Sequence, residues 1–192
     1  THYAAIYAFQ EPVDHTTIPT LQAVIREVKQ SATYPVGFQI ELKTDPTQPH
    51  LSASPEAMTR ALERVIKEEG IADRTKVQAY DWRCLLLLQQ LNPEIETAYL
   101  TDLAHEKVLL HVDPAIAGQW TAGYLLKNHH DSIPEMIKAL GGTWWDAEDI
   151  EITEEQLEKA HQFGLKVAAW SNSERTEMDV DVPLVEQLIA MQ

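Results

Sequence analysis

Along the chain, stretches whose apolar residues recur every three to four positions alternate with short, mostly apolar runs. The first spacing is that of an amphipathic helix, and the second is typical of a buried strand. We therefore predict helices over residues 20–31, 54–69, 82–91, 133–140, 153–164 and 182–191. Strands are predicted over residues 36–42, 76–80, 96–100, 143–146 and 165–170, whereas the pattern of residues 105–117 is ambiguous.

Capping and turn residues support these boundaries. Ser54 precedes a proline at the first helical position, and Gly70 follows the last periodic residue of the same helix. Strands that alternate with helices predict a parallel α/β architecture, either a (β/α)-barrel or a doubly wound sheet. No G-x-G-x-x-G or G-x-x-x-x-G-K pattern follows a predicted strand, which weakens the nucleotide-binding version of the second architecture.

The ends of the predicted strands carry the candidate chemistry, because functional residues of an α/β barrel gather at the carboxyl ends of its strands. Glu41 and Lys43 lie two positions apart and so share a face of their strand with Gln39. The later strands contribute an amide and several aromatic rings near their ends: Gln78, Tyr80, Tyr99, Trp145 and Trp170.

Two interpretations of this set are open. Glu41 would bind a hard cation and Lys43 would offset phosphate charge, with the aromatic rings at the rim, which suits a metal-bound phosphate ester of a small polyol. Alternatively, Glu41 and Lys43 form a structural ion pair among core aromatic residues, since a lone charge inside a barrel is costly.

Composition limits the partners. The net charge of the 192 residues is −15, which argues against nucleic acid or an anionic membrane surface as the main partner. An anionic small substrate stays open, because a bound cation can reverse the field within one pocket. The single cysteine, Cys84, excludes an internal disulfide and a multi-cysteine zinc site. No apolar run is long enough to cross a bilayer, and the sequence leaves localisation open between cytoplasm and periplasm.

Several segments, in order along most of the chain, resemble glycerophosphodiester phosphodiesterases. They are Ile18-Pro19-Thr20-Leu21, Ile40-Glu41-Leu42-Lys43, Val77-Gln78-Ala79-Tyr80-Asp81-Trp82-Arg83, Tyr99-Leu100-Thr101, Ala160-His161, Gly164-Leu165-Lys166-Val167 and Ala169-Trp170. Trp145 matches the tryptophan of the family's W-S-P segment, although Asp146-Ala147 replace Ser-Pro. Ser171-Asn172-Ser173 stand where the family has T-V-N.

The resemblance implies a (β/α)8 TIM-type barrel of the phospholipase C-like phosphodiesterase kind. About five of its strands are expected here, so residues 1–192 would form one partial barrel domain, with residues 1–19 at the end of the family's small insertion. The implied activity is the metal-dependent hydrolysis of glycerophosphodiesters, such as glycerophosphocholine, to glycerol 3-phosphate and an alcohol. The implied metal is Mg²⁺ or Ca²⁺, and the implied partner is this small-molecule substrate.

The resemblance also assigns roles. Glu41 becomes a metal ligand and Lys43 the catalytic cation on the phosphate side, while Trp170 lines the glycerol pocket. The further substrate-binding residues are Gln78, Tyr80 and Trp145. The family's H-R-G and H-D segments, which carry its two catalytic histidines, and its E-x-D strand have no counterpart near the start of this sequence. We therefore expect a fragment that is inactive in isolation.

Two other functions stay open from the sequence. One is a barrel that has lost catalysis and serves as a binding or scaffold module. The other is a barrel enzyme that uses the Glu41–Lys43 pair for aldol or isomerase chemistry.

Overall fold

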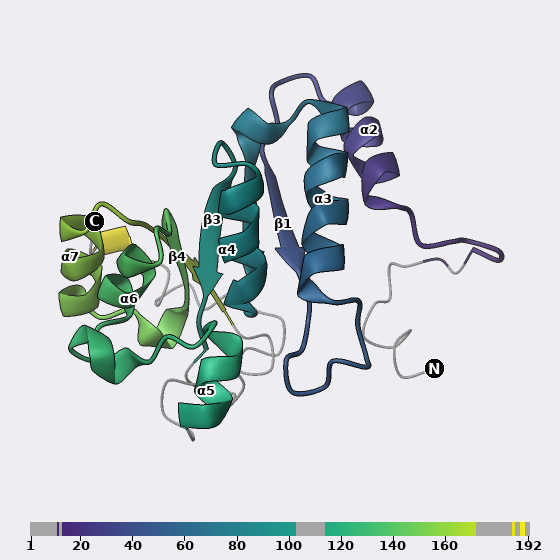
Figure 1. The fold of residues 1–192 in the computed structure, drawn as a ribbon. Helices are drawn as coiled ribbons and strands as arrows, with labels where there is room; N and C mark the ends of the chain where they lie inside the picture. The colour runs from purple at the N-terminus through teal and green to yellow at the C-terminus, as the bar shows by residue number, and fades with distance from the viewer. Residues whose placement is uncertain (1–10, 12, 103–113, 172–185, 187–188, 191–192) are drawn as a thin grey trace.

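The computed structural model describes residue 11, residues 13–102 and 114–171, and residues 186, 189 and 190 (Figure 1). Its strands are β1 (Phe38–Leu42), β2 (Thr75–Ala79), β3 (Glu96–Leu100), β4 (Trp144–Glu148) and β5 (Lys166–Trp170). Its α-helices are α2 (Leu21–Ser31), α3 (Pro55–Glu69), α4 (Trp82–Leu91), α5 (Pro114–Trp120), α6 (Ile133–Ala139) and α7 (Glu154–Gln162). Short 3₁₀ turns are η1 (Ala72–Arg74), η2 (Leu126–His129) and η3 (Asp149–Glu151).

The strands form one parallel sheet in the order β1-β2-β3-β4-β5, which is also their order along the chain. All five predicted strands and the helices between them are confirmed, with ends that differ by a few residues. Within the described residues, β1 and β5 each have a single neighbouring strand, so the sheet is an unclosed arc.

Two predicted segments fall partly or wholly outside the described residues. Residues 105–113 of the ambiguous stretch lie outside them, and the helix α5 follows directly at Pro114. Most of the helix predicted over 182–191 also lies outside, and only Glu186, Ile189 and Ala190 are described there, as helical. Among the described helices, none has the length and apolar content of a bilayer-spanning segment.

The predicted capping residues act as expected. The side chain of Thr20 accepts a hydrogen bond from the backbone N–H of Ala23, and Ser54 does the same for Ala57. Gly70 ends α3 in the left-handed conformation, with φ 61°, which costs a glycine little. Thr153 caps α7, which begins at Glu154. The local sequence therefore sets the limits of these helices.

Side chains that meet across the concave face show that the sheet is strongly curved. The Nε2 atom of Gln39 on β1 lies 3.3 Å from Oδ2 of Asp146 on β4. Neighbouring strands are about 4.8 Å apart, so a flat sheet would separate β1 from β4 by about 14 Å. Only a curled sheet brings these two side chains together, and this supports the barrel over the doubly wound sheet.

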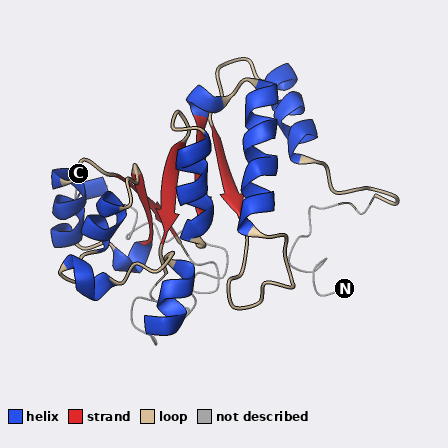
Figure 2. Cartoon of the chain, in the orientation of Figure 1, coloured by secondary structure: helices blue, strands red, loops and turns tan. Residues whose placement is uncertain are grey.

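The hydrophobic core lies between the convex face of the sheet and the helices. Strand residues on this face, including Val77, Ala79 and Tyr99, belong to one buried cluster with helix residues of α3, α4 and α6. Figure 2 shows the helices α3, α4, α6 and α7 along the outside of the arc. Helices on a single side of a curved parallel sheet are the arrangement of a (β/α)-barrel.

Candidate active site

Strand alternation and register decide which predicted site residues share a face. Glu41 on β1 lies directly opposite Gln78 on β2, and both belong to the face that the helices do not cover. The side-chain amides of Gln39 and Gln78 form a hydrogen bond on the same face. Tyr80 lies two positions beyond Gln78 and faces the same way. These residues therefore share the concave face, as the strand spacing predicts, and their roles in binding stay predictions.

Glu41 and Lys43 form an ion pair at the carboxyl end of β1. The Nζ of Lys43 lies 3.1 Å from Oε1 of Glu41, and their side chains are 79% and 24% exposed, respectively. The pair is therefore not the buried structural pair of the alternative interpretation. A solvated pair of this kind contributes at most about 1 kcal/mol to stability. Both side chains remain accessible to a ligand.

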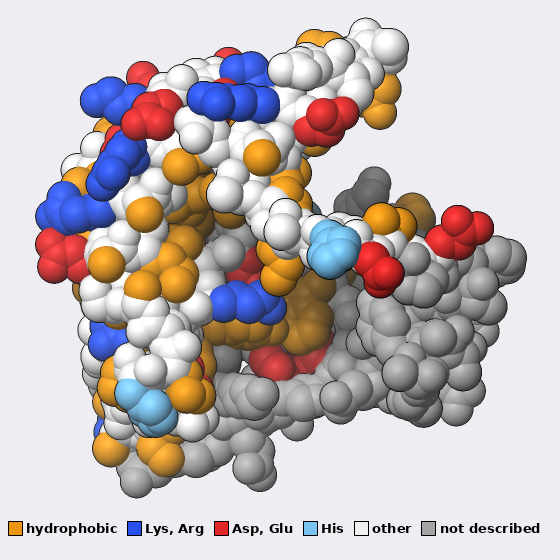
Figure 3. Space-filling view, turned by 90° about the vertical axis from the view of Figure 1, so that its right-hand side faces the viewer, with side chains coloured by type: hydrophobic (Ala, Val, Ile, Leu, Met, Phe, Trp, Pro, Cys, Tyr) orange, Lys and Arg blue, Asp and Glu red, His pale blue; other side chains and the backbone are white. Residues whose placement is uncertain are grey.

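The pair opens into a cavity of about 420 Å³ at the carboxyl ends of β1 and β2. The cavity is lined by residues of β1 and the loop after it, by Tyr80, and by two residues of α5: Glu41, Leu42, Lys43, Thr44, Asp45, Thr47, Gln48, Tyr80, Ile116 and Trp120. Part of the lining is thus charged and polar, and the part formed by Tyr80, Ile116 and Trp120 is aromatic and apolar. Seen from the side in Figure 3, the molecule is hollowed, and acidic, basic and apolar side chains lie within the hollow.

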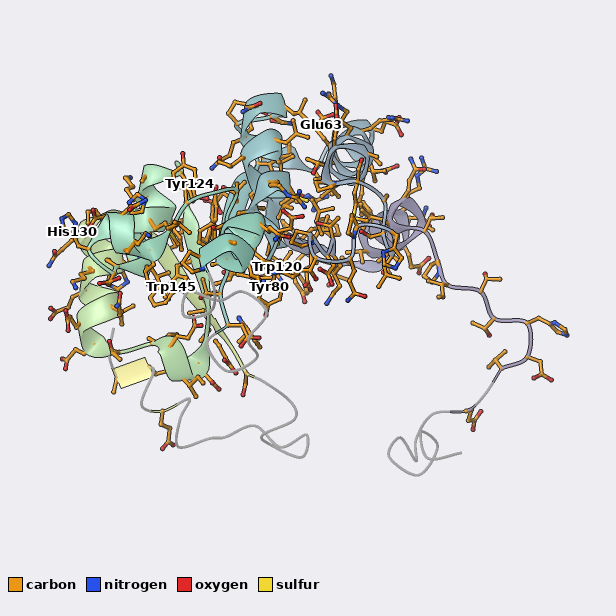
Figure 4. The ribbon with its side chains drawn as sticks, turned by 60° about the horizontal axis from the view of Figure 1, so that its bottom comes forward. Glu63, Tyr80, Trp120, Tyr124, His130 and Trp145 are labelled. Carbon is orange, nitrogen blue, oxygen red and sulfur yellow. The ribbon has the colours of Figure 1, made fainter. Side chains whose placement is uncertain are left out.

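Tyr80 and Trp120 form the aromatic wall. Both pack with Ile116 in a small cluster that is separate from the main core. Figure 4 shows Tyr80 and Trp120 close together, at a distance from Trp145. The ring of Trp170 on β5 meets Tyr80 edge-to-face, with centroids 6.2 Å apart. Trp170 therefore also reaches the mouth, as predicted.

The placement predicted for Trp145 is wrong. Trp145 is fully buried in the main core, and its Nε1 donates a hydrogen bond to Thr101 Oγ1 at 2.8 Å. Tyr99, also expected at the mouth, is fully buried on the same convex face and packs edge-to-face on Trp82. In the register of the sheet, Tyr99 lies beside Ala79 on one neighbouring strand and beside Trp145 on the other. Ala79 is the residue after Gln78, so its side chain points to the opposite face from that of Gln78. The alternation of the pleat therefore turns both rings toward the helices.

The sequence analysis missed several residues of the mouth. Trp120 and Ile116 come from α5, at the end of the stretch whose pattern was ambiguous. Buried carboxyl groups lie at or just after the ends of β3 and β4, among them Asp102, Glu148 and Glu151. Their position directly after two predicted strands was a signal that could have identified them.

These carboxyl groups and Glu41 create a negative environment around Tyr80. Burial raises the pKa of the Tyr80 hydroxyl, and the charges of Asp102, Glu41, Glu148 and Glu151 raise it further. Burial also raises the pKa of Glu151 to about 7, although a hydrogen bond from Thr101 opposes the shift. Glu151 therefore titrates near neutral pH.

Among the described residues, the buried polar atoms without a hydrogen-bond partner include two close to the mouth. They are Oε1 of Glu151 and Nε1 of Trp170. A buried donor or acceptor without a partner is costly, by about 1–3 kcal/mol. The tryptophan N–H is therefore a candidate contact for a polar ligand atom.

The opposite end of the concave face is a network of ion pairs. Lys76 lies 3.1 Å from Asp146, and Lys166 lies 2.6 Å from Glu96. The Nζ atoms of both lysines lie over the ring of Trp144, at 4.1 and 5.0 Å from its centroid. These charges are paired with each other, so we assign this end a structural role.

The described residues do not form a metal centre by themselves. Among them, no three or more His, Cys, Asp or Glu side chains are grouped so that they could hold an ion. Glu41 offers carboxylate oxygens of the kind that Mg²⁺ and Ca²⁺ prefer, from a position that faces the cavity. It can therefore supply one ligand of such a site, and further ligands would have to come from elsewhere.

Comparison with solved structures finds the same fold in phosphodiesterases. A protein from Silicibacter pomeroyi DSS-3, described as a glycerophosphoryl diester phosphodiesterase, aligns with a TM-score of 0.71 and 20% identity over 100% of this chain and 56% of its own. A protein from Galdieria sulphuraria, described as a glycerophosphodiester phosphodiesterase, aligns with a TM-score of 0.68 and 15% identity over 95% of this chain and 61% of its own.

A third structure is the Oleispira antarctica phosphodiesterase in complex with its product sn-glycerol-3-phosphate. It aligns with a TM-score of 0.59 and 18% identity, over 90% of this chain and 54% of its own. The sequence matches no family model and no curated protein. The chain spans less than two thirds of these neighbours, and at such identities the likeness concerns the fold. The chain thus has the fold of a little over half of a glycerophosphodiester phosphodiesterase, an incomplete (β/α)-barrel, in agreement with the family resemblance of its sequence motifs.

Proposed function

We propose that this chain contributes the substrate-binding half of a metal-dependent glycerophosphodiester phosphodiesterase. The observation that carries the proposal is the solvated Glu41–Lys43 pair at the mouth of a cavity of about 420 Å³, at the carboxyl end of a parallel barrel arc. The fold neighbours bear this activity in their names, and one of them holds glycerol 3-phosphate.

The roles of the charged pair follow from its chemistry. Glu41 would supply one carboxylate to a Mg²⁺ or Ca²⁺ ion, which when bound polarises the phosphoryl oxygens and neutralises their charge. Lys43, with its flexible ammonium, would hold a phosphate oxygen. Gln78 and Trp170 lie on the same concave face and offer an amide and an indole N–H to the hydroxyl groups of the glycerol moiety.

Proton transfer would come from groups outside the described cavity wall. No described histidine lines the cavity. General acid–base groups commonly contribute about 10²–10⁴-fold each to such a reaction. We therefore propose that the groups that transfer protons lie outside the described cavity wall, and we expect the 192 residues alone to bind product far better than they turn over substrate.

The same observation supports a second candidate function. A barrel arc that binds a phosphorylated polyol without an imidazole in its cavity would serve as a binding module. The phosphodiesterase and the binding module would both bind glycerol 3-phosphate, but only the phosphodiesterase would hydrolyse the diester. Measurements of binding and of turnover therefore separate them.

The test is calorimetric binding of glycerol 3-phosphate with and without Mg²⁺ or Ca²⁺. We expect binding that is tightened by the cation. Glu41→Gln should abolish the tightening by the cation. Lys43→Ala should weaken the binding of glycerol 3-phosphate about tenfold, and the cation should still tighten it. Exposed residues away from the cavity provide the controls Glu158→Gln and Lys127→Ala. If Glu41→Gln leaves the response to the cation unchanged, the assignment is wrong.

Turnover of glycerophosphocholine should then be measured for this chain and for a protein that contains it together with flanking sequence. Activity only in the longer protein supports the phosphodiesterase. If binding persists and neither protein hydrolyses the diester, the binding module is the correct function.

A further inference from the structure

The loop that follows β1 forms part of the lining of the mouth cavity. Its lining residues are Lys43, Thr44, Asp45, Thr47 and Gln48. The ladder that joins β1 to β2 ends one residue earlier, at the pair of Leu42 and Ala79. The ammonium of Lys43 nevertheless has a defined place, 3.1 Å from Oε1 of Glu41. The place of Lys43 therefore depends on contacts made just beyond the end of the strand.

Thr44 makes such a contact. Its hydroxyl donates a hydrogen bond to Oδ2 of Asp81 at 2.7 Å, and it lies 3.5 Å from Sγ of Cys84. Thr44 is 8% exposed, and Asp81 and Cys84 are fully buried. When the register of β1 and β2 is continued two positions beyond Leu42 and Ala79, Thr44 falls opposite Asp81. A side-chain hydrogen bond therefore ties the two segments together where the backbone pairing of the strands ends.

Asp81 is itself held at a fixed angle by Arg83. Its two carboxylate oxygens accept hydrogen bonds from Nε and Nη2 of Arg83, at 2.8 and 2.7 Å. The backbone N–H of Arg83 also donates to Asp81, at 3.2 Å, and this bond caps α4. A bidentate pair with a guanidinium fixes the plane of a carboxylate. Asp81 is thus a rigid, buried acceptor at the start of α4.

The tip of the same loop is folded back by a second carboxylate. Oδ1 of Asp45 accepts hydrogen bonds from the backbone N–H groups of Thr47 and Gln48, at 2.8 and 3.2 Å. An aspartate that bonds the backbone two residues further on forms a local turn of this kind. The loop is therefore anchored at its base by Thr44 and closed at its tip by Asp45.

We propose that Thr44 and Asp81 are positioning residues for Lys43, and that the buried hydrogen bond between them raises the affinity of the cavity for phosphate. The backbone of Lys43 lies between Leu42, which the sheet and the core hold, and Thr44, which Asp81 holds. An ammonium carried by a fixed backbone loses less freedom on binding an anion than one on a flexible loop. The inference rests on the proposed function, which assigns the phosphate to Lys43.

The experiment replaces Thr44, because removing Asp81 would also remove the cap of α4 and the partner of Arg83. Thr44→Val has nearly the same shape and cannot donate the hydrogen bond. We expect it to weaken the binding of glycerol 3-phosphate about three- to tenfold in calorimetric titrations, and no more than Lys43→Ala does. Thr44→Ser keeps the hydroxyl and should bind like the wild type. Urea unfolding of each variant shows that the affinities refer to folded protein.

Two further measurements separate positioning from a general effect on the fold. In the Lys43→Ala background, Thr44→Val should cause no further weakening, because the hydroxyl acts through the ammonium. Thr44→Val should also keep the tightening by Mg²⁺, because Glu41 is held within the ladder of β1 and β2. The matched control is Thr75→Val, which removes a buried hydrogen bond of the same length, 2.7 Å, from a residue that does not line the mouth cavity. It should leave the affinity unchanged.

Wild-type affinity in Thr44→Val would overturn the positioning inference. An equal loss with and without the ammonium of Lys43 would also overturn it, because the hydroxyl would then act on the ligand by itself. In both cases the proposed function would stand as long as Lys43→Ala weakens binding. A wild-type chain that does not bind glycerol 3-phosphate would refute the proposed function, and the inference with it.

Discussion

The rings of Tyr80, directly after β2, and of Trp170 on β5 meet edge-to-face, with an interplanar angle of 88°. Two strands, β3 and β4, separate β2 from β5 in the sheet. The contact therefore spans the mouth of the arc, and it exists only because the sheet curls. The same curvature places the charged pair of β1, the aromatic wall and the carboxyl groups of β4 around one opening.

The two tryptophans Trp145 and Trp170 should respond differently to replacement by phenylalanine. Trp145→Phe removes a core hydrogen bond to Thr101 and leaves a small void, so we expect a loss of about 1–3 kcal/mol in the free energy of unfolding. It should leave glycerol 3-phosphate affinity unchanged. Trp170→Phe should weaken that affinity with little loss of stability, because Trp170 Nε1 has no hydrogen-bond partner among the described residues. Urea unfolding measures the stability of both variants, and calorimetry measures their affinity for glycerol 3-phosphate. If Trp145→Phe weakened the affinity and left stability unchanged, the placement of Trp145 in the core would be contradicted.

A methyl group at Gly142 should destabilise the chain. A Cβ there would lie 2.6 Å from side-chain atoms of both Ile137 and Tyr99, which are buried on the convex face. Gly142→Ala should therefore lower the free energy of unfolding by about 1–3 kcal/mol. Gly118→Ala on α5 is the matched control, because its nearest neighbour would lie at 3.7 Å. Equal stability of the two variants in urea would show that the contact between α6 and β3 is looser than described.

Replacing only one partner of the Lys76–Asp146 ion pair should lower the free energy of unfolding more than replacing both. Their side chains are 13% and 3% exposed, with 3.1 Å between the charged atoms. Lys76→Met leaves a buried carboxylate without its cation, so we expect a loss of about 3–5 kcal/mol. The double replacement Lys76→Met with Asp146→Asn should recover part of this loss in urea unfolding. A double variant that is less stable than Lys76→Met would contradict this account.

Stability should fall with rising pH because of Glu151. Burial raises the pKa of Glu151 from its ordinary value of 4.5 to about 7, so the folded chain binds more protons than the unfolded chain between these values. The stabilising effect of the proton is complete below about pH 4.5 and is lost as pH rises through about 7. Glu151→Gln should therefore gain up to about 3 kcal/mol relative to wild type at pH 8 and little at pH 4.5.

Urea unfolding at the two pH values measures this difference, with Glu158→Gln as the control on exposed helix surface. A Glu151→Gln variant whose stability relative to wild type is the same at both pH values would show that Glu151 is ionised normally.

Local patterns were enough to predict the elements and the order of the fold. Helix limits follow from capping residues such as Ser54 and Gly70, which act within one turn of the backbone. The alternation of strands and helices predicts a parallel sheet, and the spacing of Glu41 and Lys43 predicts a shared face. The family motifs pointed to the same barrel fold as the structural neighbours.

The face on which a strand-end residue lies could not be predicted from the sequence in the same way. Trp145 and Trp170 both stand near strand ends, yet one is in the core and the other at the mouth. Their faces depend on the register between neighbouring strands, where a shift of one residue reverses every side chain. Trp120 was missed for a related reason. Its place in the wall depends on how α5 packs over Tyr80, a contact between segments that are distant in sequence. The sequence by itself determined the elements and the charged pair, because these rest on short-range periodicity and spacing. Only the tertiary structure decided which aromatic rings meet that pair, because sheet curvature and register arise from contacts among all five strands.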